Sequence, residues 1–395
     1  MLRQRAVLDI QNEFRKIINK IASTYELVNL EIFNCFAEGN FKNANIRMPL
    51  FGIEKTVPSD PPTPWIINTI EFDDVFDLRI LEALTNIDTL GDKTMDPNLM
   101  LAYKSLINYI TEKEKHDLCL SRICKAQDGS LPESSSETDI AYALGVHLFG
   151  PLTGGSCVVD NHSRSKSCPG GCKATAQKGP TGIGAVQIWH GFADIIVNHK
   201  IPVDVWKEVT DVCTAGPDRD SDESSDSETD ESPGSTYSSD IMSMKQPLCQ
   251  LIAQTITNSF AQVNQNKRLS NFLIPAFGCS NKQLVIFGYD SENDILVKKI
   301  DPILLWTSTD DDRWHLSVSA VVHIWMYIHF QFLMIPSLTK RCETNIQSNF
   351  HKCNTVELFR RYSRCHTKQF PLEERINLLS TPHTRIKPVK KIKLN

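Results

Sequence analysis

The chain has 395 residues, of which 41% are hydrophobic and 23% charged, and its formal net charge is −5. These values are ordinary for a folded protein of one large or two smaller domains, and they exclude a chain that is disordered throughout. The charge is unevenly distributed: residues 218–231 contain eight acids and one Arg, whereas residues 338–395 contain thirteen Lys or Arg and four Glu. An acidic segment and a basic end are typical of proteins that bind nucleic acid, although solvated surface has the same composition.

Residues 1–126 are predicted to form a helical N-terminal region. Apolar residues recur every three or four positions over residues 7–37, and helical patterns return at 73–85 and 98–125, after a Pro-rich loop at 57–64. Residues 1–16 are charged and contain no secretory apolar stretch, so we expect an intracellular location with reduced cysteines. This region contains no candidate catalytic residue.

Residues 137–337 are predicted to form an α+β core with one central mixed sheet flanked by helices. Ser136 or Thr138 can cap a helix over residues 136–148, and strands are expected at 188–197 and 201–205. A helix beginning at Pro247 precedes three short strands at 272–277, 284–287 and 295–300. Helices before and after a run of strands indicate this fold class. The acidic, Ser-rich segment 214–239 is predicted to be a disordered insert.

An apolar stretch at residues 318–335 has the length of a membrane span. Polar residues recur in it every four positions, at Ser319, His323, Tyr327 and Gln331. Such a stripe on one helical face indicates a buried or interface helix, so no membrane partner is expected.

The basic region 338–395 ends in a run of Lys and Arg at residues 385–393. This run resembles a short nuclear-localisation segment and also suits contact with phosphates. DNA is therefore an expected partner. Within the cell, the nucleus is one location that this segment predicts.

The strongest chemical signal is Asp194. It follows Gly191 by three residues and precedes three β-branched residues at 195–197. An ionised carboxylate at the start of an apolar strand needs a metal or a basic partner, unless it merely caps a turn at the strand edge. About fifty residues later, Gln250 and Gln254 share one edge of an amphipathic helix, which a solvated face would also explain.

A Gly-x-x-Asp strand, a further strand and a glutamine-bearing helix, in this order, resemble the PD-(D/E)XK nuclease fold, particularly its RecB-like exonuclease branch. The resemblance covers residues 137–299 and implies DNA phosphodiester hydrolysis dependent on Mg²⁺ or Mn²⁺. It implies Asp194 and Asp240 as metal-binding carboxylates on adjoining strands, with Glu137 or Asp139 as a further one. Gln250 would orient water or a phosphate.

The family also has a lysine two residues after the second carboxylate, on the same face of the strand. Met242 stands at that position, and Lys245 is five residues from Asp240, so that only a bulge would bring it to the site. Residues 203–207 offer Asp204 with Lys207, again at odd spacing. Two functions remain open: a weak nuclease, or an inactive member that binds nucleic acid or protein. A plain helical scaffold is a third, if the strands are absent.

A second candidate site is a zinc site in the Gly-, Ser- and Lys-rich loop 154–184. Its residues are Cys157, His162, Cys168 and Cys172, spaced Cys-x4-His-x5-Cys-x3-Cys. Four soft ligands within sixteen residues can form a tetrahedral Zn²⁺ site that stabilises a loop without a core of its own. The alternative is a set of incidental thiols on a flexible loop.

Overall fold

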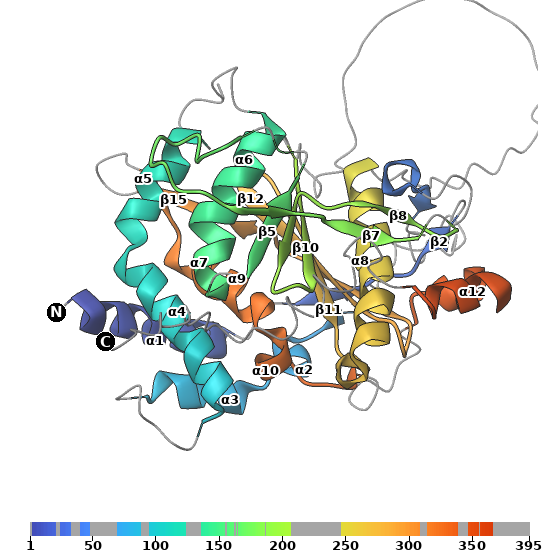
Figure 1. Cartoon of the computed structure of the whole chain (residues 1–395). Helices are drawn as coiled ribbons and strands as arrows, with labels where there is room; N and C mark the ends of the chain where they lie inside the picture. Colours follow the sequence, from blue (N-terminus) through green and yellow to red (C-terminus); the bar gives the residue numbers. More distant parts are fainter. Residues whose placement is uncertain are drawn as a thin grey trace, which may run out of the picture.

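The computed structural model describes residues 2–20, 24–32, 40–47, 69–87, 95–123, 136–154, 156–161, 163, 165–185, 187–206, 246–308, 314–338, 347–354 and 356–365. The predicted acidic insert 214–239 and the basic run 385–393 lie outside these residues. The described part confirms the α+β class, with helices at the N-terminus and one large mixed sheet (Figure 1).

The central sheet has ten strands in the order β4-β1-β13-β12-β11-β10-β9-β5-β6, with β14 paired to β12. Their bounds are Tyr25–Leu27 (β1), Thr69–Ile70 (β4), Cys157–Asp160 (β5), Gln177–Gly179 (β6), Ile195–Val197 (β9), Ile201–Val205 (β10), Ile274–Cys279 (β11), Gln283–Asp290 (β12), Ile295–Lys299 (β13) and Ile303–Leu304 (β14). Short two-stranded sheets join Glu31–Ile32 (β2) to Ile46–Arg47 (β3), Gly182–Gly184 (β7) to His190–Phe192 (β8), and Trp306–Ser308 (β15) to Trp314–Leu316 (β16). The strands predicted from 188 to 205 and from 272 to 300 are therefore present.

The prediction of a helix over residues 7–37 is wrong in its second half. Helix α1 (Leu2–Lys20) covers the first half, but Tyr25–Leu27 form strand β1 between β4 and β13. Tyr25 and Leu27 are buried, and Glu26 between them pairs with Lys298 of β13, with Oε2 and Nζ 3.6 Å apart. Two buried residues at alternate positions fit a strand, and pairing on both sides supplies the backbone hydrogen bonds that decide the outcome.

Helices cover both faces of the sheet. One face carries α1, α4 (Pro97–Thr111), α6 (Glu137–Leu144), α7 (Gly150–Thr153) and α9 (Val318–Ile328), and the other carries α8 (Gln246–Gln265) (Figure 1). The remaining helices are α2 (Phe72–Val75), α3 (Leu78–Thr85), α5 (Lys113–Ile123), α10 (Phe330–Leu333), α11 (Phe350–Cys353), α12 (Val356–Tyr362), the π-helix η2 (Gly145–Phe149), and the 3₁₀ turns η1 (Phe41–Asn43) and η3 (Lys267–Leu269). Alternation along β10 sends Val203 and Val205 to the first face and Asp204 to the α8 face.

Helix α8 is a crossover connection. Strands β10 and β11 are parallel neighbours, and α8 lies between them in the sequence. Parallel neighbours require such a crossover, so α8 must pass over the sheet next to β10. The helix predicted from Pro247 is confirmed, and its position determines what its polar edge contacts.

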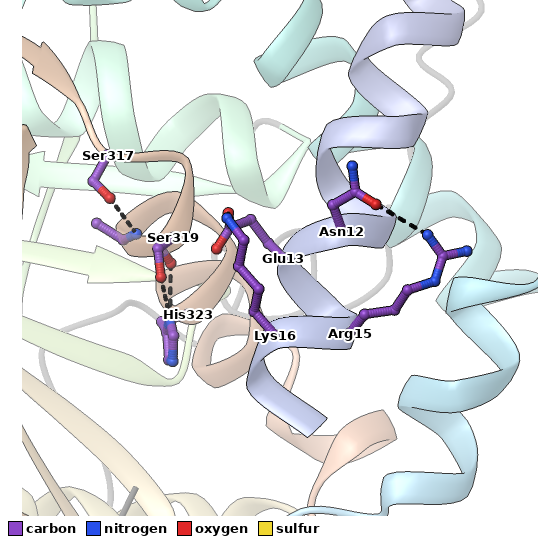
Figure 2. Close-up of polar contacts among 8 residues, drawn as sticks. Asn12, Glu13, Arg15, Lys16, Ser317, Ser319 and His323 are labelled. Atoms are coloured by element: carbon purple, nitrogen blue, oxygen red, sulfur yellow. Dashed lines mark hydrogen bonds and ion pairs between the residues drawn. The ribbon is translucent and has the colours of Figure 1, made fainter. Parts of the chain in front are cut away.

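The apolar stretch at 318–335 forms α9 and the short α10. Figure 2 shows Ser319 and His323 of α9 beside Glu13 and Lys16 of α1. His323 Nδ1 lies 2.8 Å from the Ser319 carbonyl oxygen, and the Tyr327 hydroxyl lies 2.7 Å from that of Tyr25. Three residues of the polar stripe, Ser319, His323 and Tyr327, thus form hydrogen bonds within the protein. No helix in the described part of the chain has the length and hydropathy needed to cross a bilayer.

Trp206, directly after β10, packs flat against the neighbouring strand. Gly278 of β11 pairs with Asp204, and a Cβ atom at Gly278 would lie only 2.2 Å from Trp206 Cη2. Glycine at this position therefore makes room for the indole ring beside Asp204.

We expect Gly278→Ala to lower the free energy of unfolding by about 1–3 kcal/mol, because the added methyl group overlaps the buried indole. Urea denaturation measures the change. Gly288→Ala on β12 is the matched control, since its Cβ would meet its nearest neighbours at 3.4 Å. Equal destabilisation of the two variants would contradict the packing of Trp206 on Gly278.

Candidate functional site

Two carboxylates lie beside each other at one end of the β9–β10 hairpin: Asp194 directly precedes β9, and Asp204 is in β10. The antiparallel register pairs Ile195 with Val203, so the next position places Asp194 across from Asp204. The Val205 N–H donates to Asp194 Oδ2 at 2.7 Å, and Asp204 is only 2% exposed. Like charges directly opposite each other in a sheet repel, and burial strengthens this repulsion.

Two glutamines of α8 donate hydrogen bonds to the Asp204 carboxylate. Gln250 Nε2 donates to Asp204 Oδ2 and Gln254 Nε2 donates to Asp204 Oδ1, each at 2.9 Å. The two residues are one helical turn apart, so their amides reach the same carboxylate. Both oxygens of Asp204 are thereby held in one orientation by neutral donors.

The same edge of α8 continues along the β9–β10 hairpin. Asn258 Nδ2 donates to the Lys200 carbonyl oxygen at 2.6 Å, and Gln262 Nε2 donates to that of His199 at 3.3 Å. Gln254, Asn258 and Gln262 are all buried. The edge is therefore a row of hydrogen-bond donors directed at the hairpin, and the solvated helix face that the sequence also allowed is wrong.

Burial raises the pKa of both carboxylates. For Asp204 the charge of Asp194 raises the pKa further, and the two glutamine amides offset only part of the shift. For Asp194 the Val205 N–H acts in the opposite direction, while the charges of Glu137 and Asp160 raise the pKa further. Among the described residues, neither carboxylate forms an ion pair with Lys, Arg or His. The mutual repulsion of the two carboxylates is therefore not offset by an ion pair in the part of the chain that the structure describes.

Trp206 stands two residues after Asp204 and packs in the core on the same face of the sheet. Its Nε1–H is buried without a hydrogen-bond partner among the described residues. An indole can donate a hydrogen bond but cannot exchange a proton near neutral pH. The local motif is thus Asp-x-Trp.

Lys42 is an exposed residue of η1 whose positive charge offsets a small part of the rise that burial causes in the pKa of each carboxylate. The turn η1 is held against the site at two points. The Phe41 ring lies on Gly191, where a Cβ would be 2.7 Å from Cδ2, and Gln246 Nε2 donates to the Lys42 carbonyl oxygen. Gly191 is thus the residue that lets η1 approach β8. The N-terminal region, predicted to be chemically silent, supplies this lysine.

Of the residues named from the sequence, Gln250 and Gln254 contact Asp204 beside Asp194, and the charge of Glu137 at the start of α6 acts on Asp194. Asp240, Met242 and Lys245 lie outside the described residues. The carboxylate found beside Asp194 is Asp204, which the sequence argument set aside because Lys207 is at odd spacing. The available signal was an ionisable residue inside the apolar run at 201–205, which has the same implication as Asp194.

A second cluster consists of thiols and an imidazole. Cys119 of α5, His147 of η2 and Cys172 place one ligand atom each within 4.8 Å of one another, so they can hold a metal ion. His147 Nε2 lies 3.1 Å from Cys172 Sγ and 3.2 Å from Cys168 Sγ. The prediction of a metal site formed by Cys157, His162, Cys168 and Cys172 is therefore supported in part: a possible metal site is present and includes Cys172, with Cys168 next to His147.

The other two predicted ligands are not part of this cluster. Cys157 is on β5, where its side chain packs against Gly145 and Gly150 of the adjoining helix, and His162 lies outside the described residues. Cys119 and His147 were missed because they are 49 and 21 residues before Cys168 in the sequence. Only the packing of α5 and η2 brings them to the loop.

The thiols differ in acidity. Burial raises the pKa of Cys119, and raises that of Cys168 to about 11. Burial acts on Cys172 in the same direction, but hydrogen bonds from the Ala174 N–H and from the other two thiols outweigh it and lower its pKa. Burial also lowers the pKa of His147, which favours the neutral imidazole that binds metals.

Comparisons with protein-family models, with curated proteins and with solved structures found no match to this chain. The chemistry of the two clusters is therefore the basis on which a function is assigned.

We expect Asp204→Asn to stabilise the metal-free protein at pH 8 by about 1–3 kcal/mol. A carboxyl with a raised pKa stabilises the fold at acid pH, and this stabilisation is lost as the pH rises through the folded-state pKa. At pH 8 the wild-type chain therefore holds two buried like charges. The gain should shrink towards pH 4, where Asp204 is protonated. Buried Gln254 Oε1, which has no partner among the described residues, can accept from the new amide.

Thermal unfolding in EDTA as a function of pH measures this effect. The exposed Glu292→Gln is the control and should follow the wild-type profile. A variant at Asp204 that is less stable than wild type at pH 8 would show that the carboxylate is a net stabilising group.

Proposed function

We propose that this chain is a metal-dependent DNA phosphodiesterase with a PD-(D/E)XK-like core. The observation that carries the proposal is the placement of Asp194, which directly precedes β9, beside Asp204 of β10, whose carboxylate accepts from two glutamines of the crossing helix α8. This is the arrangement that the resemblance implies, with Asp204 in the role expected of Asp240.

The residues present suit a hard divalent cation. Mg²⁺ prefers oxygen ligands and is commonly held by one or two carboxylates together with waters. Asp194 and Asp204 would hold it, with Glu137 close enough for its charge to raise the pKa of Asp194. Mn²⁺ suits the same oxygen ligands. The bound cation would supply charge neutralisation and activation of water.

Other residues of the chain orient the Asp204 carboxylate and cover the sheet next to it. Gln250 and Gln254 hold Asp204 in one orientation, and Trp206 covers the sheet beside it. We assign to Lys42 the positive charge that the family places after its second carboxylate. Lys42 is exposed, so its ammonium can contact a phosphate while its charge acts on both carboxylates.

DNA is supported as the substrate by the balance of thirteen Lys or Arg to four Glu over residues 338–395. Arg360 and Arg361 of α12 are in the described part of this region. The run at 385–393 supports both phosphate contact and a nuclear location.

Trp206 favours a second candidate, a catalytically inactive protein that binds DNA. An indole in place of the family lysine removes a proton-handling group from the strand, and such a group contributes about 10²–10⁴-fold to a rate. In the active nuclease, Lys42 takes over the role of the missing family lysine. In the inactive binding protein, it does not.

We expect the full-length protein to cleave end-labelled DNA in Mn²⁺ or Mg²⁺ but not in EDTA. Asp194→Asn and Asp204→Asn should each lower the rate by at least about 10²-fold while leaving DNA binding intact, because the cation assists both the nucleophile and the transition state. Lys42→Ala should lower the rate by about 10- to 100-fold, and Lys42→Arg should retain part of it. Single-turnover rates measure these effects.

Lys267→Ala on η3 is the control, an exposed lysine whose charge does not act on the carboxylates. DNA binding without cleavage under any metal condition would support the inactive binding protein. Neither binding nor cleavage at low salt would overturn both candidates.

The donors of the second cluster select a different metal. Thiolates and imidazole suit Zn²⁺, whereas Mg²⁺ is held by oxygen. We therefore propose Zn²⁺ as the metal of the cluster formed by Cys119, His147 and Cys172.

A further inference from the structure

Four potential soft ligands come from three separate segments of the chain. Cys119 is on α5, His147 is on η2, and Cys168 and Cys172 are in the loop that leads from β5 to β6. Cys119, His147 and Cys168 are no more than 4% exposed. Buried thiols and imidazole that converge from distant segments are the usual makeup of a structural zinc site.

The separations suit four-coordinate geometry. Zn–S bonds of about 2.3 Å and Zn–N bonds of about 2.0 Å place tetrahedral ligand atoms about 3.5–3.8 Å apart. His147 Nε2 is 3.2 Å and 3.1 Å from the sulfurs of Cys168 and Cys172, and Cys172 is hydrogen-bonded to the thiols of Cys168 and Cys119. Outward movements of a few tenths of an ångström bring His147 Nε2 and the sulfurs of Cys168 and Cys172 to zinc-binding separations. Cys168 is outside the group of ligand atoms that lie within 4.8 Å of one another, so its sulfur must also move toward Cys119 to complete the site.

The loop Cys168-Pro-Gly-Gly-Cys172 is built around the sulfur atoms. The Gly170 N–H donates to Cys168 Sγ at 3.3 Å, a contact that stabilises a thiolate. A Cβ at Gly170 would lie 2.8 Å from the Cys119 carbonyl oxygen, so glycine allows the loop to lie directly on α5. Arg122 Nη1 donates to the Gly170 carbonyl oxygen at 3.0 Å and holds the loop there.

His147 is oriented by a second histidine. Its Nδ1 lies 3.2 Å from His116 Nδ1, and the His116 ring stacks on Tyr109 with centroids 4.7 Å apart. Zinc-binding histidines commonly use their other nitrogen in this way, which leaves Nε2 free for the metal. The π-helical turn that contains His147 is a local departure from α-helix of the kind found at functional sites.

We infer that Cys119, His147, Cys168 and Cys172 form a closed, four-ligand structural Zn²⁺ centre, with Cys168 as the fourth ligand. On binding, the thiols release their protons to solvent and each sulfur donates an electron pair to the metal. Four protein ligands leave no open position, so the centre takes no part in hydrolysis.

The centre joins the loop and α5 to the helix that positions Glu137. Helix α6, η2 and α7 follow one another without a break from Glu137 to Thr153, so His147 and Glu137 belong to one continuous helical segment. The loop after Cys172 leads directly to β6, which pairs with β5. Metal binding therefore stabilises this side of the sheet.

The test begins with the full chain purified without a metal-chelating tag. Elemental analysis by mass spectrometry should find about one zinc per chain. After replacement of zinc by Co²⁺, the visible spectrum should show intense tetrahedral d–d bands and a sulfur-to-cobalt charge-transfer band. At a Co²⁺ concentration high enough to saturate the weakened site, Cys168→Ser should show a charge-transfer intensity lower by about a third, since one of three thiolates is lost. Zinc content well below one per chain with a weak, octahedral cobalt spectrum would overturn the inference.

Variants identify the ligands. Cys119→Ser, Cys168→Ser, Cys172→Ser and His147→Ala should each lose zinc and unfold at lower temperature, whereas Cys157→Ala, a buried cysteine outside the cluster, should keep its zinc. His116→Ala should weaken zinc affinity by about 10- to 100-fold, because it orients His147 without binding the metal. Zinc loss in Cys157→Ala to the same degree as in Cys168→Ser, or a Cys168–Cys172 disulfide in the purified protein, would also overturn the inference.

The result is separable from the proposed nuclease activity. Asp204→Asn should abolish cleavage and retain zinc. If the zinc centre is absent, the proposal that Asp194 and Asp204 bind a catalytic cation still stands. If zinc is present and cleavage is not found, the structural centre stands and the nuclease proposal falls.

Discussion

The arrangement of the site depends on the hydrogen bonds that Gln250 and Gln254 donate to the buried Asp204 carboxylate. A carboxylate inside a sheet is costly unless its oxygens are satisfied, and the helix that crosses from β10 to β11 provides two amides for this purpose. Neutral donors satisfy the hydrogen bonds without cancelling the charge. Because Asp194, directly before β9, lies beside Asp204, the negative charge of each carboxylate raises the cost of ionising the other, and no ion pair among the described residues offsets this repulsion. The proposed cation would offset it.

The core on either side of the sheet follows from this crossing. Helix α8 covers one face with an apolar stripe that packs on β11 and β12, while its polar edge follows the β9–β10 hairpin down to His199. The opposite face carries the helices of the N-terminal region together with α6 and α9. The N-terminal chain also provides β1 at the far side of the sheet and η1 beside the carboxylates, so it contributes to the core and to the site alike.

The two candidate metal sites use different chemistry in one structure. Oxygen donors on β9 and β10 suit a hard cation that exchanges with water, while thiol and imidazole donors suit a metal held in a closed site. The helical segment from Glu137 to Thr153 connects them, since its first residue acts electrostatically on Asp194 and its eleventh is His147. A structural metal at one point of this segment would stabilise the position of the other.

The sequence alone determined the elements whose patterns are local. Asp194, the strands from 195 to 205, the glutamine edge of α8 and the three strands near the C-terminal end could be predicted, because periodicity and turn residues are properties of short segments. The tertiary structure decided which side chains meet. It alone chose Asp204 as the partner of Asp194, brought Lys42 to the site, and assembled Cys119 and His147 with Cys168, because contacts between distant segments depend on strand pairing and helix packing. The strand at Tyr25–Leu27 shows the same rule, since pairing with β4 and β13 overrode a helical pattern.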